Sequence, residues 1–457
     1  MEKATISDVV ARQKVFFASG VTKDLDFRLQ QLRKLHQVIS DNERRILDAL
    51  HTDLRKPTLE AYASEISLVF SEITYCVKKL RSWARPRMTL TALPLLPSRS
   101  FITYEPFGVA LILSPWNYPF QLAIAPLIGA MAAGNCAIIK PSEISPATSS
   151  VMAEIFEENF DPRYISVITG GPEVAQALLE EQFDTIFFTG STRIGRVVME
   201  AASRHLTPVT LELGGKSPCI VDSDVNMVYA ARRIAWAKFF NAGQTCVAPD
   251  YLLVDEKIME EFLDILKRQV LKFFGTDPTK SPDYARIISE GHFSRLSAYL
   301  DQGDLVVGGQ TDRAQRYIAP TIMRNAPQDA PVMHEEIFGP ILPVLSYSGF
   351  SEAIRFVNSR PKPLSLYLFS RDLERQQQVI RETSSGGICF NDAMVHVASH
   401  FLPFGGVGES GMGSYHGRAS FDAFSHTKSV VKNTLAFDIP LRYVPYRFKL
   451  QLVKWFF

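Results

Sequence analysis

The stretch VALILSPWNYPFQLAIAPLIGAMAAGNCAIIK, residues 109–140, decides the fold of this chain of 457 residues. It opens with an apolar run of strand length (109–113), continues with an apolar helical pattern (119–133) and closes with a second strand-like run (137–140). The alternation continues, with strand-like runs at 165–168 and 185–188 that are each followed by a helical pattern. Such alternation favours a parallel sheet with helices on both faces.

A second set of strand and helix patterns follows further along the chain. Strand-like runs at 251–254, 341–345 and 364–369 are followed by helical patterns at 258–274, around Ala353 and at 373–382. This set is sufficient for a second α/β domain, and the β-rich run that starts at Thr210 places the boundary there. Residues 7–85 form amphipathic helices, 86–100 an extended Pro- and Leu-rich connection, and 101–108 a strand-like hairpin or arm.

Composition excludes several classes of protein. The length suggests two or three domains, and 46% hydrophobic with 21% charged residues is typical of a soluble globular chain. A net charge of +1 gives no support for a nucleic-acid partner. The five cysteines are scattered without C-x-x-C or Cys/His spacing, which indicates a reducing compartment and no metal site. With no signal-peptide pattern at the N-terminus, the expected location is the cytoplasm.

One cysteine stands apart from the others. Cys246 lies in NAGQTCVAP (241–249), a polar turn with a glycine and a proline that follows a long helical pattern. Cys136 and Cys219 lie in strand-like runs and Cys76 in a helical pattern, where a cysteine acts as a small buried hydrophobe. The turn therefore indicates that Cys246 is the thiol presented for chemistry.

Four further stretches place polar residues among Gly and Pro directly after an apolar strand. They are SPWNYP (114–119), KPSE (140–143), FTGSTRIG (188–195) and LELGGK (211–216). Loops that follow parallel strands are where ligands bind. Residues 190–195 open a helix, so backbone N–H groups there can meet a pyrophosphate. Their spacing is G-x-x-x-x-G and departs from the usual G-x-G-x-x-G dinucleotide fingerprint.

With NAGQTC, EEIFGP (335–340) and PFGGVGESG (403–411), these stretches resemble the signature motifs of the aldehyde dehydrogenase superfamily, in the family's order and over nearly the whole chain. The N-terminus, 211–218 and 241–250 are most similar to the class 3 branch of fatty and aromatic aldehyde dehydrogenases. The resemblance implies an aldehyde-dehydrogenase-like α/β fold, with two parallel-sheet domains and a small β oligomerisation arm.

The resemblance also divides the chain. Expected are a dinucleotide-binding domain (1–85 and 106–209), a catalytic domain (210–396), bridging or oligomerisation segments (86–105 and 421–441), a glycine-rich segment near the active site (397–420), and a basic, aromatic C-terminal tail (442–457). The arm at 101–108 and the strand-like stretch 429–435 resemble the family's oligomerisation region, which implies a homodimer. The tail either packs on a neighbouring subunit or on the body, or lies on an anionic membrane surface.

The implied reaction oxidises an aldehyde to a carboxylic acid with NAD(P)+, through a thiohemiacetal and a thioester on Cys246. A thiolate is the strongest nucleophile among side chains near neutral pH. By resemblance, Asn117 and the backbone N–H of Cys246 stabilise the alkoxide, although alone Asn117 reads equally well as a turn former between prolines. Glu212 is the matching general base, and burial beside a strand and a diglycine raises its pKa.

Ten residues are expected by resemblance to hold the cofactor: Trp116, Lys140, Ser142, Glu143, Gly190, Ser191, Gly195, Leu213, Glu336 and Phe338. Lys140 and Glu143 hold the adenosine ribose, Ser191 a phosphate, and Glu336 the nicotinamide ribose with Phe338 beside the ring. A carboxylate at Glu143 repels a 2′-phosphate and favours NAD, while Lys140 leaves NADP open. Four aromatic residues either line an apolar entrance or belong to the core: Tyr118, Trp236, Phe240 and Phe404.

An apolar entrance favours medium or long aliphatic, aromatic or isoprenoid-type aldehydes. Two alternatives remain open at this point. A coenzyme-A-acylating enzyme of the same fold has no need of a water-activating base, so Glu212 argues against it. A non-catalytic protein that retained the fold is expected to lose Cys246, Glu212 or Asn117, and all three are present.

Overall fold

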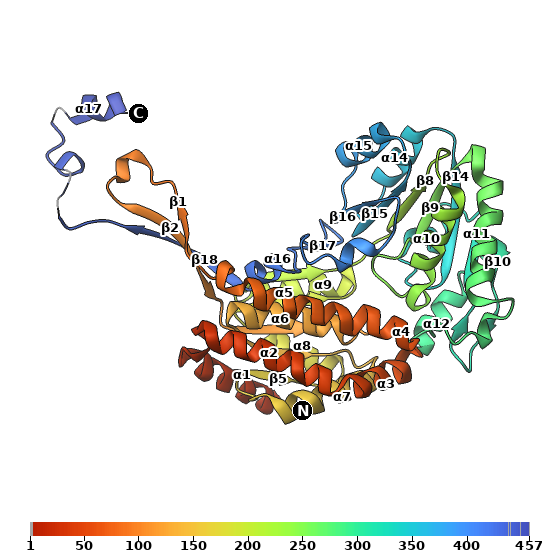
Figure 1. The fold of residues 1–457 in the computed structure, drawn as a ribbon, viewed down its shortest axis with the longest axis horizontal. Coiled ribbons are helices and arrows are strands. Elements are labelled where there is room, and N and C mark those ends of the chain that lie inside the picture. Colours follow the sequence, from red (N-terminus) through yellow and green to blue (C-terminus); the bar gives the residue numbers. More distant parts are fainter. Residues whose placement is uncertain (1–2, 437, 439, 448, 457) are drawn as a thin grey trace.

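The computed structural model describes residues 3–436, 438, 440–447 and 449–456. Outside this set lie residues 1–2 of the predicted dinucleotide-binding domain, 437 and 439 of the bridging segment, and 448 and 457 of the tail. The described chain forms two mainly parallel sheets surrounded by helices, and a long antiparallel arm that projects from this body (Figure 1). This arrangement confirms the expected fold class.

The first sheet has six strands, and β3 (Val109–Leu113) lies inside it. From β3 the chain steps outward through β4 and β5, then returns to add β6 and β7 on the other side of β3. These neighbours pair in parallel, and β17 adds an antiparallel pair at one edge. In sheet order the strands are β17 (Gly411–Met412), β7 (Val209–Glu212), β6 (Thr185–Thr189), β3, β4 (Cys136–Lys140) and β5 (Ile165–Val167).

Helices cover both faces of this sheet. Because crossovers between parallel strands are right-handed, helices α6 and α7 lie on one face, and α8 and α9 lie on the other. Helix α6 is apolar all round and every one of its 13 residues is buried, since α2, α5 and α16 pack outside it. The helices are α1 (Lys3–Ala18), α2 (Leu25–Asp41), α3 (Glu43–Leu54), α4 (Thr58–Ala61), the π-helix η2 (Tyr62–Ile66), α5 (Ser67–Trp83), α6 (Gln121–Ala133), α7 (Pro146–Asn159), α8 (Pro172–Glu180), α9 (Thr192–Ser203) and α16 (Arg418–Ala423).

The second sheet has seven strands in the order β10-β13-β14-β9-β8-β15-β16, with β10 antiparallel to its neighbour and the others parallel. The strands are β8 (Pro218–Val221), β9 (Tyr251–Asp255), β10 (Asp304–Val307), β13 (Thr321–Arg324), β14 (Ile341–Tyr347), β15 (Ser365–Phe369) and β16 (Gly387–Phe390). Its helices are α10 (Met227–Phe239), α11 (Met259–Phe274), α12 (Glu290–Ser297), α13 (Pro331–His334), α14 (Phe350–Asn358) and α15 (Leu373–Glu382). A two-stranded sheet joins β11 (Thr311–Asp312) to β12 (Tyr317–Ile318).

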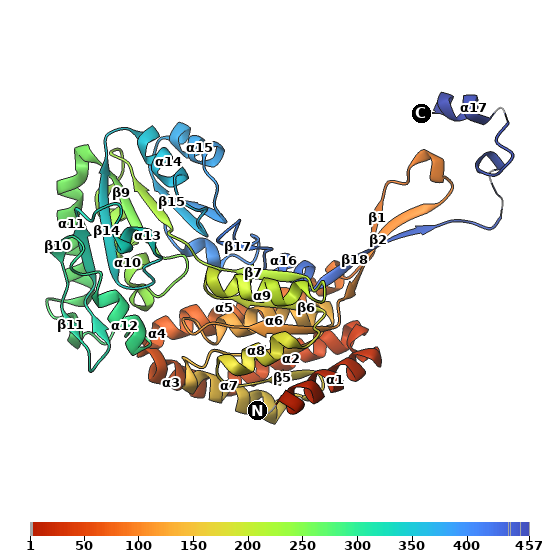
Figure 2. The same ribbon diagram turned by 180° about the vertical axis from the view of Figure 1, so that it is seen from behind.

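The arm consists of β1 (Arg87–Thr89), β2 (Arg99–Pro106) and β18 (Ser425–Lys432). Strands β2 and β18 pair antiparallel along their whole length, from Ser425 opposite Pro106 to Lys432 opposite Arg99. Both ribbon views show the arm leaving the body, with α17 (Lys449–Phe456) beyond its tip (Figures 1 and 2). The strand-like stretches predicted at 101–108 and 429–435 are therefore neighbours in one sheet.

The boundary expected at Thr210 needs correction. Strand β7 pairs with β6 in the first sheet through Val209–Glu212, and the second sheet starts at β8. The first sheet also includes β17, from the segment expected to be only a glycine-rich neighbour of the site. A strand joins whichever sheet offers it an unpaired edge, and its own sequence does not contain that information.

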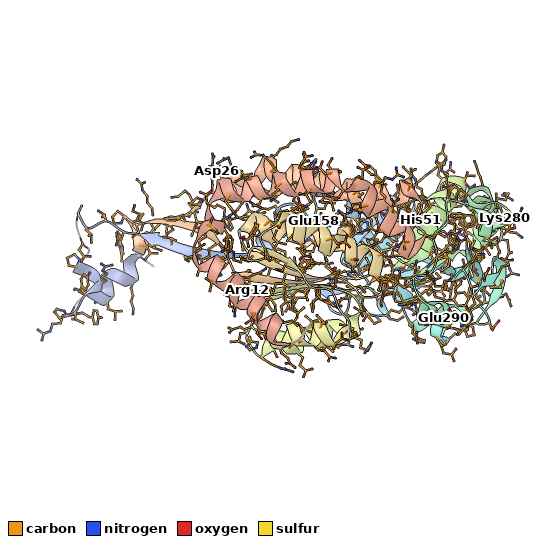
Figure 3. The ribbon with its side chains drawn as sticks, turned by 90° about the horizontal axis from the view of Figure 1, so that it is seen from below. Arg12, Asp26, His51, Glu158, Lys280 and Glu290 are labelled. Atoms are coloured by element: carbon orange, nitrogen blue, oxygen red, sulfur yellow. The ribbon has the colours of Figure 1, made fainter. Side chains whose placement is uncertain are left out.

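Charged side chains of both signs lie on the outside of the body. Figure 3 shows Arg12, Asp26, Glu158, Lys280 and Glu290, all exposed, on the helices and loops of both halves. Across the described part of the chain, every helix is too short or too polar to cross a bilayer.

Candidate functional site

Four neighbouring strands of the first sheet deliver predicted site residues to one edge. Strands β7, β6, β3 and β4 are adjacent and parallel, and each is followed by a loop with such a residue. These residues are Leu213 after β7, Gly190 after β6, Trp116 after β3, and Lys140 at the end of β4. Chain progression reverses between β3 and β6, which is where ligands bind in open α/β sheets.

The turn before Cys246 has an unusual backbone. Helix α10 gives way to the 3-10 turn η4 (Phe240–Gly243), in which Asn241, Ala242 and Gly243 have φ values of 52°, 51° and 74°. A Cβ on Gly243 would lie 2.2 Å from the Gly339 carbonyl oxygen, so only glycine fits there. Within residues 241–250 every residue is buried except Cys246, which is partly exposed. The fold therefore leaves one sulfur accessible in an otherwise closed segment.

The loop after β3 is joined to this turn by side-chain hydrogen bonds, two of which involve the Asn117 and Tyr118 side chains. Asn117 Nδ2 donates to the Gln244 carbonyl oxygen at 3.1 Å, and the Tyr118 hydroxyl lies 2.6 Å from Thr245 Oγ1. An amide nitrogen carries two N–H groups, so one N–H of Asn117 is left for a substrate oxygen. Asn117 thus lies beside the cysteine turn, as the predicted alkoxide donor must.

Gln244 was not among the expected site residues, although it lies within the NAGQTC stretch. Its side-chain nitrogen donates to the carbonyl oxygens of Asn241 (3.1 Å) and Arg286 (2.9 Å), and its oxygen accepts from the Ile288 N–H at 3.0 Å. The side chain is fully buried. Gln244 therefore fixes the turn and, through its own carbonyl, the Asn117 amide.

Glu212 ends β7 with a buried carboxylate. Neither of its oxygens has a hydrogen-bond partner among the described residues. Burial raises the pKa of Glu212 well above its ordinary value, in agreement with the direction expected from its position. A carboxyl group held this way is a strong proton acceptor once it ionises.

The Cys246 thiol lies near two acids. Its pKa is raised to about 12, chiefly by burial and also by the charges of Glu336 and Glu212, while the backbone N–H groups of Cys246 and Val247 oppose the shift. Without a ligand, the sulfur is therefore protonated at neutral pH. The backbone N–H of Cys246, one of these two groups, is the donor expected to stabilise an alkoxide on a thiol adduct.

The diglycine segment after β7 holds the EEIFGP stretch in place. A Cβ on Gly214 would lie 2.3 Å from a carboxylate oxygen of Glu336, so the acid packs directly on this backbone. Burial raises the pKa of Glu336 to about 8, and the Gly215 N–H opposes the shift. Lys216 pairs with buried Asp250 and donates to the Val332 and Glu335 carbonyls at 2.8 Å, while Asp250 accepts from the Ile337 N–H at 3.1 Å.

Three rings meet at the same place. The ring centre of Trp116 lies 5.3 Å from that of Phe338, with the two rings nearly perpendicular, and 4.7 Å from that of His292 in α12. Trp116 and Phe338, expected to hold the cofactor, are therefore neighbours although they lie far apart in the sequence. His292 was missed, because a single histidine early in a helical pattern carries no signal in the sequence.

The remaining expected cofactor residues lie around β4 and α9. Lys140 Nζ is 2.6 Å from a carboxylate oxygen of Glu143, and Ser142 Oγ accepts from the Ile144 N–H at 3.2 Å. Ser191 caps α9 by accepting from the Ile194 N–H at 3.4 Å. Added Cβ atoms would lie 2.5 Å from the Phe188 ring at Gly190 and 2.7 Å from Leu213 at Gly195, so a side chain at either position would displace its neighbour.

A cavity of about 480 Å³ opens beside Glu336. Its walls include Thr192 at the start of α9, Gly215 and Glu336, and the cationic side chains of Lys216, Arg360 and Lys362. Helix N-termini and cations favour phosphates. The donor set, the cradle formed by the glycines and the carboxylates available to ribose hydroxyls all fit a nicotinamide dinucleotide. No three His, Cys, Asp or Glu side chains in the described ranges are placed to hold a metal ion.

The four aromatic candidates for an apolar entrance have different positions. Tyr118 is buried beside Thr245. Trp236, 41% exposed, packs on Phe240 with ring centres 5.3 Å apart, directly before the cysteine turn. Phe404 stacks on His416 and packs on Tyr415. Burial raises the pKa of the Tyr415 hydroxyl, and the charges of Glu212 and Cys246 add to that shift. Tyr415 therefore lies between Phe404 and the site.

The chain matches known proteins over nearly its whole length. A family model described as "Aldehyde dehydrogenase family" matches residues 3–430. The chain is 48% identical to 4,4'-diaponeurosporen-aldehyde dehydrogenase of Staphylococcus aureus (97% of each chain covered) and 46% identical to aldehyde dehydrogenase family 3 member B3 of Mus musculus (97% and 93%). It is 47% identical to the dimeric NADP-preferring aldehyde dehydrogenase of Canis lupus familiaris (96% and 98%). The solved substrate-bound state of Staphylococcus aureus AldH superposes with a TM-score of 0.97, at 47% identity and 99% coverage of each chain.

Glu212→Gln should raise the thermal unfolding midpoint relative to the wild type, and this difference should grow as pH rises. The folded chain holds the Glu212 proton above the ordinary carboxyl pKa while the unfolded chain has released it, so wild-type stability falls with rising pH. Thermal unfolding midpoints at about pH 5 to 9, at one scan rate, measure this effect. The exposed carboxylate change Glu158→Gln is the control, and parallel curves for Glu212→Gln and the wild type would contradict the expectation.

Proposed function

Because this chain belongs to the aldehyde dehydrogenase family, whose reaction is the NAD(P)-dependent oxidation of aldehydes to carboxylic acids, we propose that Cys246, Asn117 and Glu212 carry out that reaction here. The observation that supports this assignment is their convergence. Asn117 is hydrogen-bonded into the turn that presents Cys246, and Glu212 is one of the two acids whose charge acts on that thiol. The three come from separate parts of the chain, and each has the chemical group that one step needs.

The steps follow from these groups. Cys246 Sγ adds to the aldehyde carbon, and its proton is lost to solvent. The new alkoxide accepts hydrogen bonds from the free N–H of Asn117 Nδ2 and the backbone N–H of Cys246, donors of a kind worth ~3 kcal/mol each in the transition state. Departure of hydride leaves a thioester on Sγ. Glu212 then takes a proton from water, which attacks the thioester carbon and releases the carboxylic acid and the thiol.

NAD(P)+, when bound, would supply the hydride acceptor. Residues of this chain fit it along the sheet edge: Ser191 and the start of α9 for phosphate, the Lys140–Glu143 pair for the adenosine ribose, and Glu336 for the nicotinamide ribose. Lys140 is already neutralised by Glu143, so a 2′-phosphate would meet a carboxylate without a free cation opposite. We therefore assign the chain a preference for NAD, unlike the relative whose name describes it as NADP-preferring.

The substrate class follows from the surroundings of the cysteine turn. Trp236 and Phe240 precede it, and Glu60 of α4 accepts from the Asn241 N–H at 2.8 Å, which brings exposed Leu59 and Tyr62 to the same neighbourhood. Apolar side chains at this place favour medium or long aliphatic, aromatic or isoprenoid-type aldehydes. The staphylococcal relative takes its name from an aldehyde of the isoprenoid type.

The arm supports assembly into a homodimer. Large apolar side chains are exposed along it and beyond it, including Leu90 (100%), Val431 (54%) and Leu435 (105%). Monomers rarely expose such groups together. A second copy of the chain covers them in this proposal, and the tail packs there with its exposed Val444, Tyr446 and Trp455.

Cys246→Ala should abolish aldehyde-dependent NADH formation, and Asn117→Ala should lower kcat by about 10²- to 10³-fold. NADH absorbance with saturated, aromatic and isoprenoid aldehydes of graded length measures both effects, and kcat/KM should rise with apolar chain length. Cys389→Ala, at another partly exposed thiol, is the matched control and should keep full turnover. Undiminished turnover in Cys246→Ala, or acyl-coenzyme A formation when coenzyme A is added, would contradict the assignment.

Glu143→Gln should improve NADP use relative to NAD by about tenfold, a change of ~1.4 kcal/mol, because it removes the like charge and frees Lys140 for a 2′-phosphate. The ratio of kcat/KM for the two cofactors is the measurement. Glu158→Gln removes an exposed carboxylate from α7 at a distance from Lys140 and should leave the ratio unchanged. An unchanged ratio in Glu143→Gln would show that this carboxylate does not set the preference.

Light scattering at micromolar concentration should give the mass of a dimer, and the arm substitutions Leu90→Lys with Val431→Lys should shift it toward monomer. Leu206→Lys changes an equally exposed leucine on the body and should remain dimeric. A monomeric wild-type chain that cosediments with anionic vesicles would instead support the alternative role of the tail at a membrane surface.

A further inference from the structure

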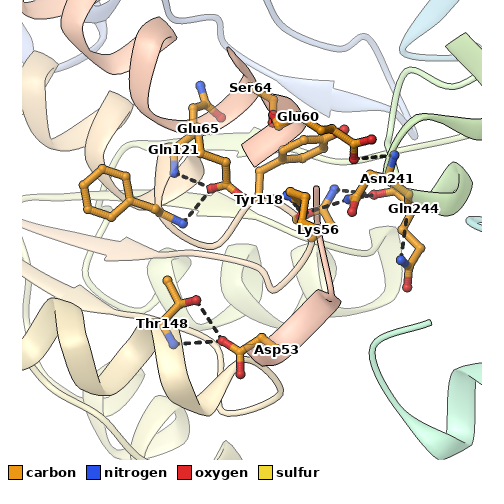
Figure 4. A network of polar contacts seen from close by, with 12 residues as sticks. Asp53, Lys56, Glu60, Ser64, Glu65, Tyr118, Gln121, Thr148, Asn241 and Gln244 are labelled. Atoms are coloured by element: carbon orange, nitrogen blue, oxygen red, sulfur yellow. Dashed lines mark hydrogen bonds and ion pairs between the residues drawn. The ribbon is translucent and has the colours of Figure 1, made fainter. Parts of the chain in front are cut away.

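A fully buried ion pair lies between the N-terminal helices and the candidate site. Lys56, between α3 and α4, places Nζ 2.6 Å from a carboxylate oxygen of Glu65 in the π-helix η2, and both side chains have no exposed surface. Figure 4 shows the pair with Tyr118 and Asn241 close by. Neither Lys56 nor Glu65 belongs to any of the motifs on which the function was assigned.

The lysine end of the pair contacts the main chain of Asn117. Lys56 Nζ donates to the Asn117 carbonyl oxygen at 3.1 Å, and Asn241 Nδ2 donates to the same oxygen at 2.9 Å. Lys56 Nζ also lies 4.2 Å from the centre of the Tyr118 ring. One ammonium group thus fixes the backbone of the residue that donates to the alkoxide, and supports the ring next to it.

The glutamate end fixes the segment that follows. The second carboxylate oxygen of Glu65 accepts from the backbone N–H groups of Phe120 (3.0 Å) and Gln121 (3.1 Å), where α6 begins. Residues 117–121 are therefore held at both ends by one ion pair. Glu65 belongs to a π-helical turn, a form of helix that occurs frequently at functional sites.

Stability alone is a poor explanation of this arrangement. Taking two charges out of water costs about as much as their attraction returns, so apolar side chains of similar volume serve stability equally well. What an ion pair supplies, and apolar packing does not, is a fixed direction for the groups bonded to it. Here those groups are the main-chain atoms that set the aim of Asn117 Nδ2.

We infer that Lys56 is a positioning residue for the carbonyl chemistry: it acts through Asn117, whose side-chain N–H it keeps aimed at the substrate oxygen. The inference rests on the function proposed above. A donor displaced by about 1 Å loses on the order of 10²-fold in rate. The loss should fall on the chemical step and leave cofactor affinity unchanged, because Lys56 contacts none of the residues assigned to the cofactor.

The test is a double-mutant cycle between Lys56→Met and Asn117→Ala. Lys56→Met should lower the single-turnover rate of NADH formation about 10- to 100-fold in the wild-type background, and less than about threefold when Asn117 is already alanine. The Kd for NAD, measured by fluorescence titration, should not change. Equal losses in both backgrounds, or an altered Kd with an unchanged rate, would overturn the inference.

Two further variants separate positioning from folding. Lys56→Met with Glu65→Gln removes both charges of the ion pair, and the amide oxygen of the new side chain can still accept from the start of α6. This variant should show the same coupling to Asn117. Arg28→Met removes another buried cation, one that donates to the Thr22, Lys23 and Ala132 carbonyls near the far end of α6. It should lower thermal stability comparably and keep the wild-type rate.

If Arg28→Met slows the single-turnover rate as much as Lys56→Met does, the loss of rate comes from general loosening of α6. That result would overturn the inference. Failure of the proposed function is a separate result, since it is decided by Cys246→Ala in the otherwise wild-type chain. If that variant keeps its turnover, the function fails whatever Lys56 does.

Discussion

The hydrogen bond from Asn117 Nδ2 to the Gln244 carbonyl joins segments 127 residues apart, and the candidate chemistry depends on it. One segment ends a strand of the first sheet, and the other leads from a helix of the second half of the chain to Cys246. The position of a catalytic thiol relative to an alkoxide donor must be accurate to a fraction of an ångström. Because each is carried by a different half, the contact between the halves is itself part of the site.

Burial of ionisable groups is the second constraint: it lowers the stability of the folded chain and favours the chemistry of the site. Glu212 has no partner for either oxygen among the described residues, Glu336 is held at a raised pKa, and the Cys246 thiol has a pKa of about 12. Each of these groups would ionise more readily in water. Buried as they are, these groups retain the proton affinity and the electrostatic strength that acyl transfer requires, so the protein tolerates a local cost in stability.

The sequence was sufficient for much of this arrangement and not for the rest. Alternating patterns predicted both sheets, and the turn around Cys246 was evident from its polar neighbours. The placement of β7 was wrong because strand pairing is decided by the available sheet edge. Gln244 was predictable in principle, since it lies inside a recognised motif. Lys56, Glu65 and His292 were not, because an isolated charged residue or histidine among helices reads as surface until tertiary contacts bury it.

The half-hidden, protonated sulfur of Cys246 also affects how the protein withstands oxidants. Peroxides and disulfides attack thiolates, so a thiol that keeps its proton at neutral pH is slow to form sulfenic acid or mixed disulfides. The candidate nucleophile is thus protected in the resting state chiefly by its burial. Oxidants should accordingly inactivate the resting protein more slowly than they modify a free cysteine at the same oxidant concentration.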